Sequence, residues 1–228
     1  RMKWQNPPDC FKLDDSDVHI WQVNLDAIVL NSAILSIDER SRADRFKFEQ
    51  HRRRFIAGRG FLRSLLSRYL NTDPSRLEFS YGSHGKPFLK DARIQFNLAH
   101  SQHLALYAVT IERSIGIDIE QVRPVEQLDQ LVQRFFLPAE AKVIQSQPAL
   151  FFHYWTCKEA FLKATGTGLS KLKELEIENT QLKTIPVESR SQHWHLQTLA
   201  INDQFAGAIV IEQNCPKLNL NYFRVGEP

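Results

Sequence analysis

Residues 104–120 have the sequence LALYAVTIERSIGIDIE, and this stretch decides how the chain is organised. Residues 104–111 form a continuous apolar run that predicts a buried strand, and the polar residues 112–114 that follow are typical of a turn. Residues 115–120 then begin a new strand, in which isoleucines alternate with glycine and acidic residues. The chain therefore restarts near residue 112, with one half before the turn and a second half after it.

Both halves have the same order of elements, which is a strand, then helices, then strands. In the first half, Ser36 stands at a capping position and residues 51–70 place apolar side chains at helical spacing. This half is expected to contain a strand at residues 19–25, a helix after Ser36, a helix at 51–70, and strands at 77–81, 94–98 and 104–111. The second half is expected to contain a strand at 115–120, helices at 125–136, from 138 and at 150–165, and strands at 193–201, 205–211 and 218–225.

This order predicts an α+β fold of two similar, pseudo-repeated subdomains, residues 1–112 and 113–228. Each subdomain is expected to hold a small, mainly antiparallel sheet with packed helices, and the active site is expected between them. Because the repeat lies in the order of elements and not in the letters, a single continuous domain is the alternative interpretation.

The composition is that of a globular protein, because 43% of the 228 residues are hydrophobic and 24% are charged. Residues 205–211, an unbroken apolar run, fall far short of the roughly 20 apolar residues that a membrane helix needs. The first residues of the chain lack the apolar run of a secretory signal. Three widely spaced cysteines, Cys10, Cys157 and Cys215, fit neither a disulfide framework nor a zinc site. We therefore expect a soluble cytoplasmic protein with no membrane partner.

The charge is unevenly distributed along the chain. The formal net charge is +3, but residues 40–68 contain ten basic and two acidic residues and carry +8, which leaves −5 on the remainder. Such a segment favours a polyanionic partner, which is a nucleic acid, an anionic membrane surface or a phosphate-rich small molecule.

The motif GIDIE at residues 116–120 places Asp118 and Glu120 on one side of a strand, because side chains two residues apart point the same way. Two neighbouring carboxylates at a buried strand end are costly unless a cation lies between them. Mg²⁺ is the natural occupant, since it uses one or two carboxylates together with phosphate oxygens and water. A solvated strand end is the alternative interpretation of these five residues.

A second motif, WTCKEAFLK at residues 155–163, lies in the last long helix of the second half. Glu159 and Lys163 are four residues apart, so their side chains lie one above the other on one helix face. Alone, they are an ordinary surface ion pair worth at most about 0.5 kcal/mol. Their presence in the same half as Asp118 and Glu120 favours a shared site.

Two short motifs in the first half carry groups that can bind phosphate. Lys86 belongs to GKP at residues 85–87, and His100 belongs to NLAHS at residues 97–101, at the end of a predicted strand. Both side chains can donate hydrogen bonds to phosphate oxygens. Each alone is more often an ordinary loop residue than a ligand-binding one.

In order and spacing these four motifs resemble the 4′-phosphopantetheinyl transferase superfamily, in particular its Sfp-like group of two-subdomain monomers. The resemblance covers about residues 36–170, and the pairing of GIDIE with WTCKEAFLK is its most specific part. It implies an enzyme of the holo-[acyl-carrier-protein] synthase type. Such an enzyme transfers the 4′-phosphopantetheine group of coenzyme A to a serine of an apo acyl or peptidyl carrier protein and releases adenosine 3′,5′-bisphosphate. The pathways implied are fatty-acid, polyketide or nonribosomal peptide biosynthesis.

The resemblance also implies a role for each matching residue. The ligands of Mg²⁺, with Mn²⁺ as an alternative ion, are expected to be Asp118, Glu120 and Glu159. The residues expected to contact coenzyme A are Lys86, His100, Lys163, and Arg54 or neighbouring arginines such as Arg42. For catalysis, Lys163 is expected to neutralise phosphate charge. The base that accepts the serine proton is expected to be Glu159, acting directly or through a metal-bound water, with Glu140 as the second candidate.

Three features depart from the family pattern. Ala99 stands where many relatives have serine, so one hydroxyl contact to phosphate is absent and a lower affinity for coenzyme A is expected. Ile119 cannot bind a metal, so water is expected at that position. Lysines that relatives use before the long helix are either replaced here by Arg40, Arg42 and Arg45 or absent. Which arginine contacts coenzyme A and which contacts an acidic carrier protein stays open.

Two other classes of protein compete with this enzyme. A metal-dependent nuclease built on residues 40–68 is disfavoured because the Glu-x-Lys pattern of nucleases is missing. A simple nucleic-acid-binding protein is disfavoured because the arginines lie on a helix whose other face is core, with no aromatic residues interleaved on the same face. A non-catalytic module that binds carrier proteins is disfavoured because the set of Asp118, Glu120, Glu159 and Lys163 is complete. We therefore expect no nucleic-acid partner.

Overall fold

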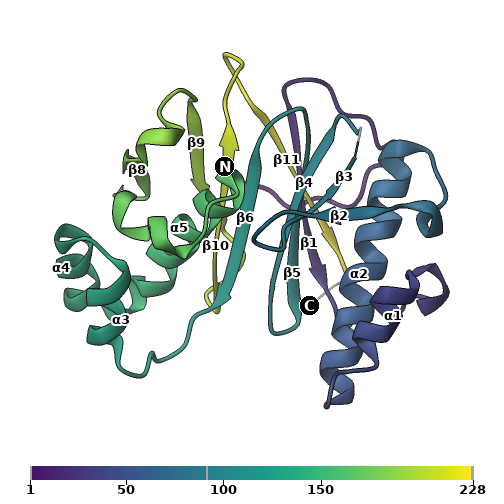
Figure 1. Ribbon diagram of the computed structural model, residues 1–228, viewed down its shortest axis with the longest axis horizontal. Helices are drawn as coiled ribbons and strands as arrows, with labels where there is room; N and C mark the ends of the chain where they lie inside the picture. The colour runs from purple at the N-terminus through teal and green to yellow at the C-terminus, as the bar shows by residue number, and fades with distance from the viewer. Residues whose placement is uncertain (1, 91, 227–228) are drawn as a thin grey trace.

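The computed structural model describes residues 2–90 and 92–226, which form two α+β subdomains side by side (Figure 1). The N-terminal helices lie on the right of Figure 1 and the C-terminal helices on the left, with two sheets between them. The prediction of an α+β fold with two similar subdomains is confirmed, since each half of the chain repeats the order strand, helices, short hairpin and strands.

The first subdomain begins with a strand and ends with two antiparallel strands. Its elements are β1 (Asp17–Asn24), α1 (Ile37–Ala43), α2 (Glu49–Leu70), β2 (Phe79–Tyr81), β3 (Pro87–Leu89), β4 (Ile94–Ser101) and β5 (Leu104–Ile111). Ser36 caps α1, as the sequence predicts, because its side chain accepts a hydrogen bond from the Glu39 backbone N–H while the Glu39 carboxylate accepts one from the Ser36 N–H. This reciprocal cap places the Glu39 side chain at the start of the helix.

The second subdomain repeats this order with more helices. Its elements are β6 (Ile115–Gln121), α3 (Leu128–Phe135), α4 (Pro138–Ser146), α5 (Phe151–Thr165), β7 (Glu176–Glu178), β8 (Gln181–Thr184), β9 (Trp194–Thr198) and β10 (Phe205–Glu212). α5 ends where the sequence predicts, because Gly166 adopts the left-handed conformation with a φ of 71°. The short strands β3, β7 and β8 are not predicted, since three or four residues are too few to show an alternating pattern.

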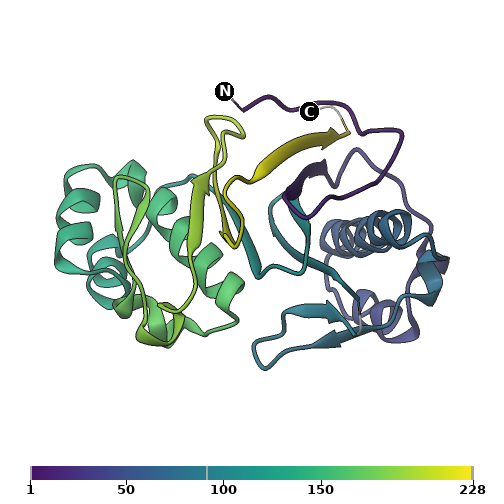
Figure 2. The same ribbon diagram turned by 90° about the horizontal axis from the view of Figure 1, so that it is seen from above.

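The main sheets have the strand orders β11-β1-β5-β4 and β6-β10-β9, with β1 and β11 parallel and the other pairs antiparallel. β11 (Asn219–Val225) comes from the end of the chain and completes the first sheet, so the sequence pattern identifies this strand but not its sheet. The first described segment of the chain runs beside β11, where Gln5 bridges to Phe223, so the first and last described segments lie on the same side of the molecule (Figure 2).

The two sheets share an apolar core. Ile20 and Leu106 of the first sheet belong to the same buried cluster as Ile117 and Ile119 of β6. This burial fixes the register of β6, because a shift by one residue would turn its isoleucines to the opposite face. The alternate residues of β6, including Asp118, therefore face α5.

α5 lies very close to β6 at Gly116. A Cβ atom at this position would be 2.0 Å from the Ala160 carbonyl oxygen and 2.3 Å from the Ala164 amide nitrogen. Only glycine permits this approach of two backbones. The glycine of the GIDIE motif therefore sets the distance between β6 and the helix that carries Glu159 and Lys163.

Among the described residues, α2 packs against the first sheet and α5 against the second. In that part of the chain, no helix is both long enough and apolar enough to cross a membrane.

Candidate active site

A cleft of about 740 Å³ lies between the two subdomains. α2, β4 and the loop at residues 82–86 contribute to one wall, and β6, α5 and residues 166–169 contribute to the other. The residues proposed from the sequence that line this cleft are Arg42, Arg54, Lys86, His100, Asp118, Glu120, Glu159 and Lys163. The fold thus brings together residues from four separate motifs, and Glu140 is the exception.

Asp118 on β6 faces the cleft and is only 5% exposed. Its Oδ1 accepts a hydrogen bond from Lys163 Nζ at 2.7 Å, whereas Oδ2 is buried without a hydrogen-bond partner among the described residues. Burial raises the pKa of Asp118 to about 7, with the Lys163 ammonium opposing this shift and the Glu159 and Glu120 carboxylates adding to it. A buried carboxylate with an unsatisfied oxygen and acidic neighbours favours the binding of a cation.

Glu120 and Glu159 complete the group of carboxylates in the cleft. Glu120 follows Asp118 on the same face of β6, and its Oε2 accepts a hydrogen bond from Ser101 Oγ at 3.1 Å. Glu159 comes from α5, where burial raises its pKa, the Lys163 ammonium opposes that shift and the Glu120 carboxylate adds to it. Mutual repulsion of three carboxylates from two elements is what a divalent cation relieves.

The donor set fits Mg²⁺ in its chemistry, because it consists of hard carboxylate oxygens beside room for phosphate and water. Among residues 2–90 and 92–226, no three His, Cys, Asp or Glu side chains are already gathered as a metal-binding group. Instead, Lys163 Nζ supplies the positive charge at Asp118 Oδ1. The groups that could hold an ion are the free oxygen of Asp118 and the carboxylates of Glu120 and Glu159.

Lys86 and His100 reach the cleft from the first subdomain. Lys86 Nζ donates hydrogen bonds of 2.8 Å to the carbonyl oxygens of Ile115, at the start of β6, and Lys163, near the end of α5. Lys86 therefore ties the two subdomains together, and its burial lowers its pKa to about 8. Partial desolvation lowers the pKa of His100, and the Lys163 ammonium lowers it further, so the neutral imidazole dominates at neutral pH.

The basic segment 40–68 is only partly available to a ligand. Arg59 and Arg63 are buried, and their Nε atoms donate to the Glu39 carboxylate at 3.0 and 2.6 Å. These two arginines are therefore not free to bind a polyanionic partner. Glu39 lies one residue before the segment, so the charge count of +8 omits the carboxylate that pairs with both of them.

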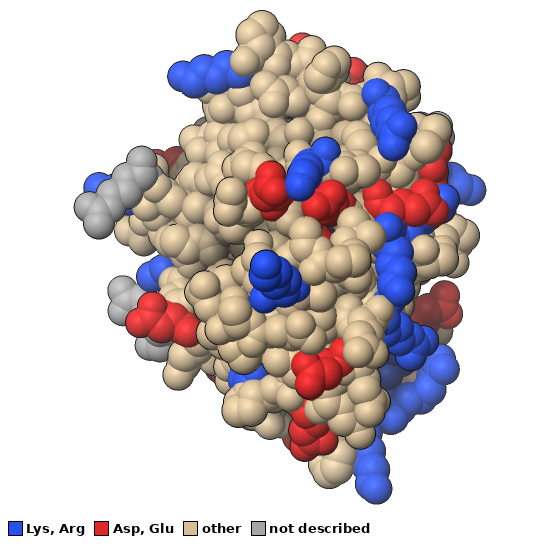
Figure 3. Space-filling view, turned by 90° about the vertical axis from the view of Figure 1, so that its left-hand side faces the viewer, with Lys and Arg blue, Asp and Glu red and all other residues tan. Residues whose placement is uncertain are grey.

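Arg42 and Arg54, the two arginines proposed to contact coenzyme A, both line the cleft. Arg54 also makes two hydrogen bonds to Asp26, of 2.8 and 2.6 Å, and Arg42 lies 5.3 Å from the centroid of the Phe55 ring. On the opposite end of the molecule, the face of the C-terminal helices, positive and negative side chains are interspersed (Figure 3).

Glu140 lies apart from this group, in the first turn of α4. Its Oε2 is 2.8 Å from Lys158 Nζ, both side chains are fully buried, and the carboxylate also accepts hydrogen bonds from the backbone N–H groups of Leu137 and Ile177. The assignment of Glu140 as the second candidate base does not fit this position. Each carboxylate oxygen is already engaged, and the residue does not line the cleft.

Sequence reasoning missed the polar residues that join the two sheets beside the cleft. Asn97 Oδ1 accepts a hydrogen bond from the Ile117 backbone N–H at 2.8 Å, and Ser101 Oγ accepts one from the Gln121 N–H at 3.0 Å. Both belong to the motif NLAHS, which the sequence relates only to phosphate. A polar side chain within an otherwise apolar strand is the signal that could have indicated this second role.

A cleft with carboxylates on one wall and cations on the other, between two pseudo-repeated subdomains, is typical of an enzyme that handles a phosphate ester. Residues 114–210 match the family model of the 4′-phosphopantetheinyl transferase superfamily, and residues 19–112 match that of the 4′-phosphopantetheinyl transferase N-terminal region. The chain belongs to the 4′-phosphopantetheinyl transferase superfamily, which confirms the family predicted from the four motifs.

Individual relatives agree with this placement. The chain is 45% identical over 223 residues to the 4′-phosphopantetheinyl transferase HetI of Nostoc sp. (strain PCC 7120), and the match covers 90% of this chain and 91% of HetI. It is 33% identical over 144 residues to the 4′-phosphopantetheinyl transferase Sfp of Bacillus subtilis (strain 168), a match that covers 60% of this chain and 63% of Sfp. These matches confirm the predicted class of enzyme, a transferase.

Proposed function

We propose that this protein transfers the 4′-phosphopantetheine group of coenzyme A to a serine hydroxyl of an apo acyl or peptidyl carrier protein, with Mg²⁺ as the metal. The observation that carries the proposal is the cleft itself, where Asp118, Glu120 and Glu159 from the second subdomain face Lys86 and His100 from the first. Family membership supplies the reaction, and the geometry supplies a place for its anionic substrate.

In this proposal, the cations of the cleft bind and orient the pyrophosphate of coenzyme A. Lys163 Nζ and His100 neutralise phosphate oxygens, while Arg42 and Arg54 hold the charged nucleotide end. Asp118, Glu120 and Glu159 would hold Mg²⁺, which supplies charge stabilisation at the pyrophosphate. The serine oxygen attacks the phosphorus that carries the pantetheine, the bond from that phosphorus to the bridging oxygen breaks, and adenosine 3′,5′-bisphosphate leaves.

The serine proton needs an acceptor, and Glu159 is the residue proposed for this role. Burial raises the pKa of its carboxylate, and a more basic carboxylate accepts a proton more readily. Among the described residues, no hydrogen bond or ion pair engages the Glu159 carboxylate, so its oxygens are available to accept a proton. Glu140, by contrast, is engaged with Lys158 and is not part of the proposal.

The experiment that tests this function is the intact mass of an apo acyl carrier protein incubated with the protein, coenzyme A and MgCl₂. The expected result is the gain of one phosphopantetheine and the release of an equal amount of adenosine 3′,5′-bisphosphate. A panel of apo carriers from fatty-acid, polyketide and peptide synthesis identifies the preferred carrier. No mass gain on any carrier, with the enzyme folded and coenzyme A in excess, would refute the proposal.

Calorimetric titration of coenzyme A with and without MgCl₂ tests the metal separately. Because the carboxylates and the pyrophosphate repel each other, Mg²⁺ is expected to tighten coenzyme A binding, and Asp118→Asn is expected to weaken this coupling. Equal affinities with and without Mg²⁺ would argue against the metal site while leaving the transferase assignment open to the mass assay.

A further inference from the structure

Tyr81 is a large aromatic side chain that is exposed and yet fixed in position. It ends β2, is 50% exposed and lines the cleft between the subdomains. Its hydroxyl accepts a hydrogen bond from Nη2 of Arg59, whose guanidinium carbon lies 5.8 Å from the centroid of the Tyr81 ring. Fixing the exposed Tyr81 ring costs side-chain entropy, and the bond to Arg59 is not needed to satisfy the hydroxyl, because water could do so. A ring held in this way is preorganised for a ligand.

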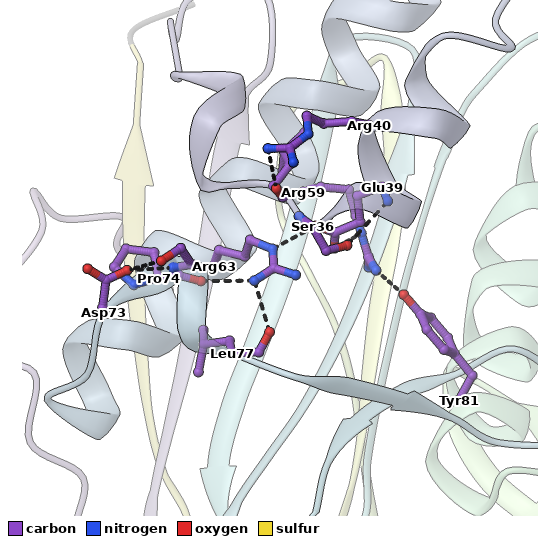
Figure 4. Close-up of polar contacts among 11 residues, drawn as sticks. Ser36, Glu39, Arg40, Arg59, Arg63, Asp73, Pro74, Leu77 and Tyr81 are labelled. Atoms are coloured by element: carbon purple, nitrogen blue, oxygen red, sulfur yellow. Dashed lines mark hydrogen bonds and ion pairs between the residues drawn. The ribbon is translucent and has the colours of Figure 1, made fainter.

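Arg59 donates to Tyr81 from a buried position, and Figure 4 shows the hydrogen bond that joins the two side chains. Only 8% of Arg59 is exposed, and its Nε donates to Glu39 Oε1 at 3.0 Å. Its guanidinium carbon also lies 5.3 Å from the centroid of the Phe79 ring on the same strand as Tyr81. Glu39 of α1, Arg59 of α2 and Tyr81 of β2 are therefore joined by direct side-chain hydrogen bonds.

The charges of this cluster leave a positive excess behind Tyr81. The single carboxylate of Glu39 is shared by Arg59 and Arg63, and Nη1 of Arg63 donates to two neutral backbone carbonyls. A neighbouring recess of about 510 Å³, which Tyr81 also lines, carries Arg42 and Arg45 as well. Its lining also includes Asp38 and Glu78, so four arginines face three carboxylates there. This end of the cleft therefore offers an aromatic ring next to arginines that outnumber the carboxylates by one, which suits a ligand with a planar base and phosphates.

We propose that Tyr81 forms an aromatic wall for the adenine base of coenzyme A, and that Arg59, fixed by Glu39, is the positioning residue that holds this wall. The inference rests on the proposed function, because it takes coenzyme A as the ligand of the cleft. At its nucleotide end, coenzyme A combines a planar base with phosphates, and its thiol arm has neither. The base is therefore assigned to the end of the cleft formed by Tyr81.

The test compares Tyr81→Ala with wild-type protein in steady-state transfer to a carrier protein. The KM for coenzyme A is expected to rise about 5- to 100-fold, as base stacking on an aromatic side chain predicts, with kcat and the KM for the carrier unchanged. With an analogue of coenzyme A that lacks the adenine base, the two proteins are expected to have equal KM values. Phe88→Ala is the matched control, because Phe88 is an exposed aromatic residue on the partner strand β3 and does not line the cleft.

A double-mutant cycle tests the positioning role of Arg59. Tyr81→Phe keeps the ring and removes only the bond to Arg59, so a smaller rise in KM for coenzyme A, about 2- to 5-fold, is expected. Arg59→Met is expected to give a similar rise in wild-type protein and no further rise in the Tyr81→Phe background. Glu39 keeps Arg63 as its partner, so Arg59→Met does not leave an unpaired buried carboxylate.

Four results would overturn the inference while the wild-type protein remains an active transferase. One is an unchanged KM for coenzyme A in Tyr81→Ala, and another is an equal rise with the analogue that lacks adenine. The third is a rise confined to the KM for the carrier, which would assign Tyr81 to carrier docking. The fourth is an additive effect of Arg59→Met and Tyr81→Phe. Failure of the wild-type protein to transfer at all would instead refute the proposed function.

Discussion

Replacement of Glu140 by glutamine tests whether this acidic residue supports the fold or the chemistry. The glutamine keeps the size of the side chain but removes the negative charge that faces Lys158 Nζ at 2.8 Å, where both side chains are completely buried. Lys158 also donates to the carbonyl oxygens of Leu172 and Leu175, so its ammonium remains buried in the variant with neutral acceptors only.

The cost of leaving one partner of a buried ion pair uncompensated is about 3–5 kcal/mol. For a protein of this size, each kcal/mol shifts Tm by about 2–4 °C, so a fall of about 6–20 °C is expected for Glu140→Gln. Part of the anchor between α4 and β7 is also weakened, because the Ile177 backbone N–H donates to Glu140 Oε1 at 2.8 Å. The kcat for transfer, measured well below Tm, is expected to stay at the wild-type value.

Differential scanning calorimetry and the transfer assay measure the two effects on one preparation. Glu174→Gln is the matched control, because Glu174 pairs with Lys171 at the surface and such pairs contribute about 0–1 kcal/mol. A wild-type Tm combined with a large loss of kcat in Glu140→Gln would refute the structural role of Glu140 and would indicate a catalytic one.

Three further predictions concern residues in and beside the cleft. Gly116→Ala is expected to destabilise the protein by at least about 3 kcal/mol in chemical denaturation, because its Cβ would lie 2.0 Å from the Ala160 oxygen; a loss below about 1 kcal/mol would contradict the close packing of α5 on β6. Asn97→Ala is expected to cost about 1–3 kcal/mol, since the buried Ile117 N–H loses its acceptor, and unchanged stability would show that water replaces it. The pKa of His100 is lowered, so its ring is neutral near pH 7.5. A bound phosphate would raise that pKa, so the binding of coenzyme A in the absence of divalent cations is expected to be accompanied by proton uptake at His100. Calorimetry in buffers of different ionisation enthalpy measures this uptake, which His100→Gln is expected to reduce, and a wild-type heat that is independent of the buffer would exclude it.

The sequence predicts the fold well where side-chain patterns are long. Residues 104–111 are predicted as a strand and form β5 with the same ends, and GIDIE and WTCKEAFLK are predicted to share a site and face one another in the cleft. The first prediction follows from local geometry, because the period of a strand fixes which side chains share a face. The second rests on the presence of both motifs in the same half of the chain and on the family resemblance.

Contacts between distant segments are what the sequence does not reveal. Glu39 neutralises part of the positive charge of residues 40–68 by pairing with Arg59 and Arg63. Lys158 forms a buried ion pair with Glu140, so that carboxylate is not available for catalysis. Neither pairing has a signature at fixed spacing, since each depends on how separate elements pack in three dimensions. For the same reason, the alternating pattern of β11 predicts a strand without indicating that it joins β1.

The most direct test of the central claim is the mass of an apo carrier protein incubated with coenzyme A, MgCl₂ and either Glu159→Gln or Glu140→Gln, at a temperature where both variants are folded. If Glu159 works in the cleft and Glu140 only in the fold, Glu140→Gln adds one phosphopantetheine at the wild-type rate and Glu159→Gln adds almost none. Full transfer by Glu159→Gln would contradict the assignment of the cleft as the active site.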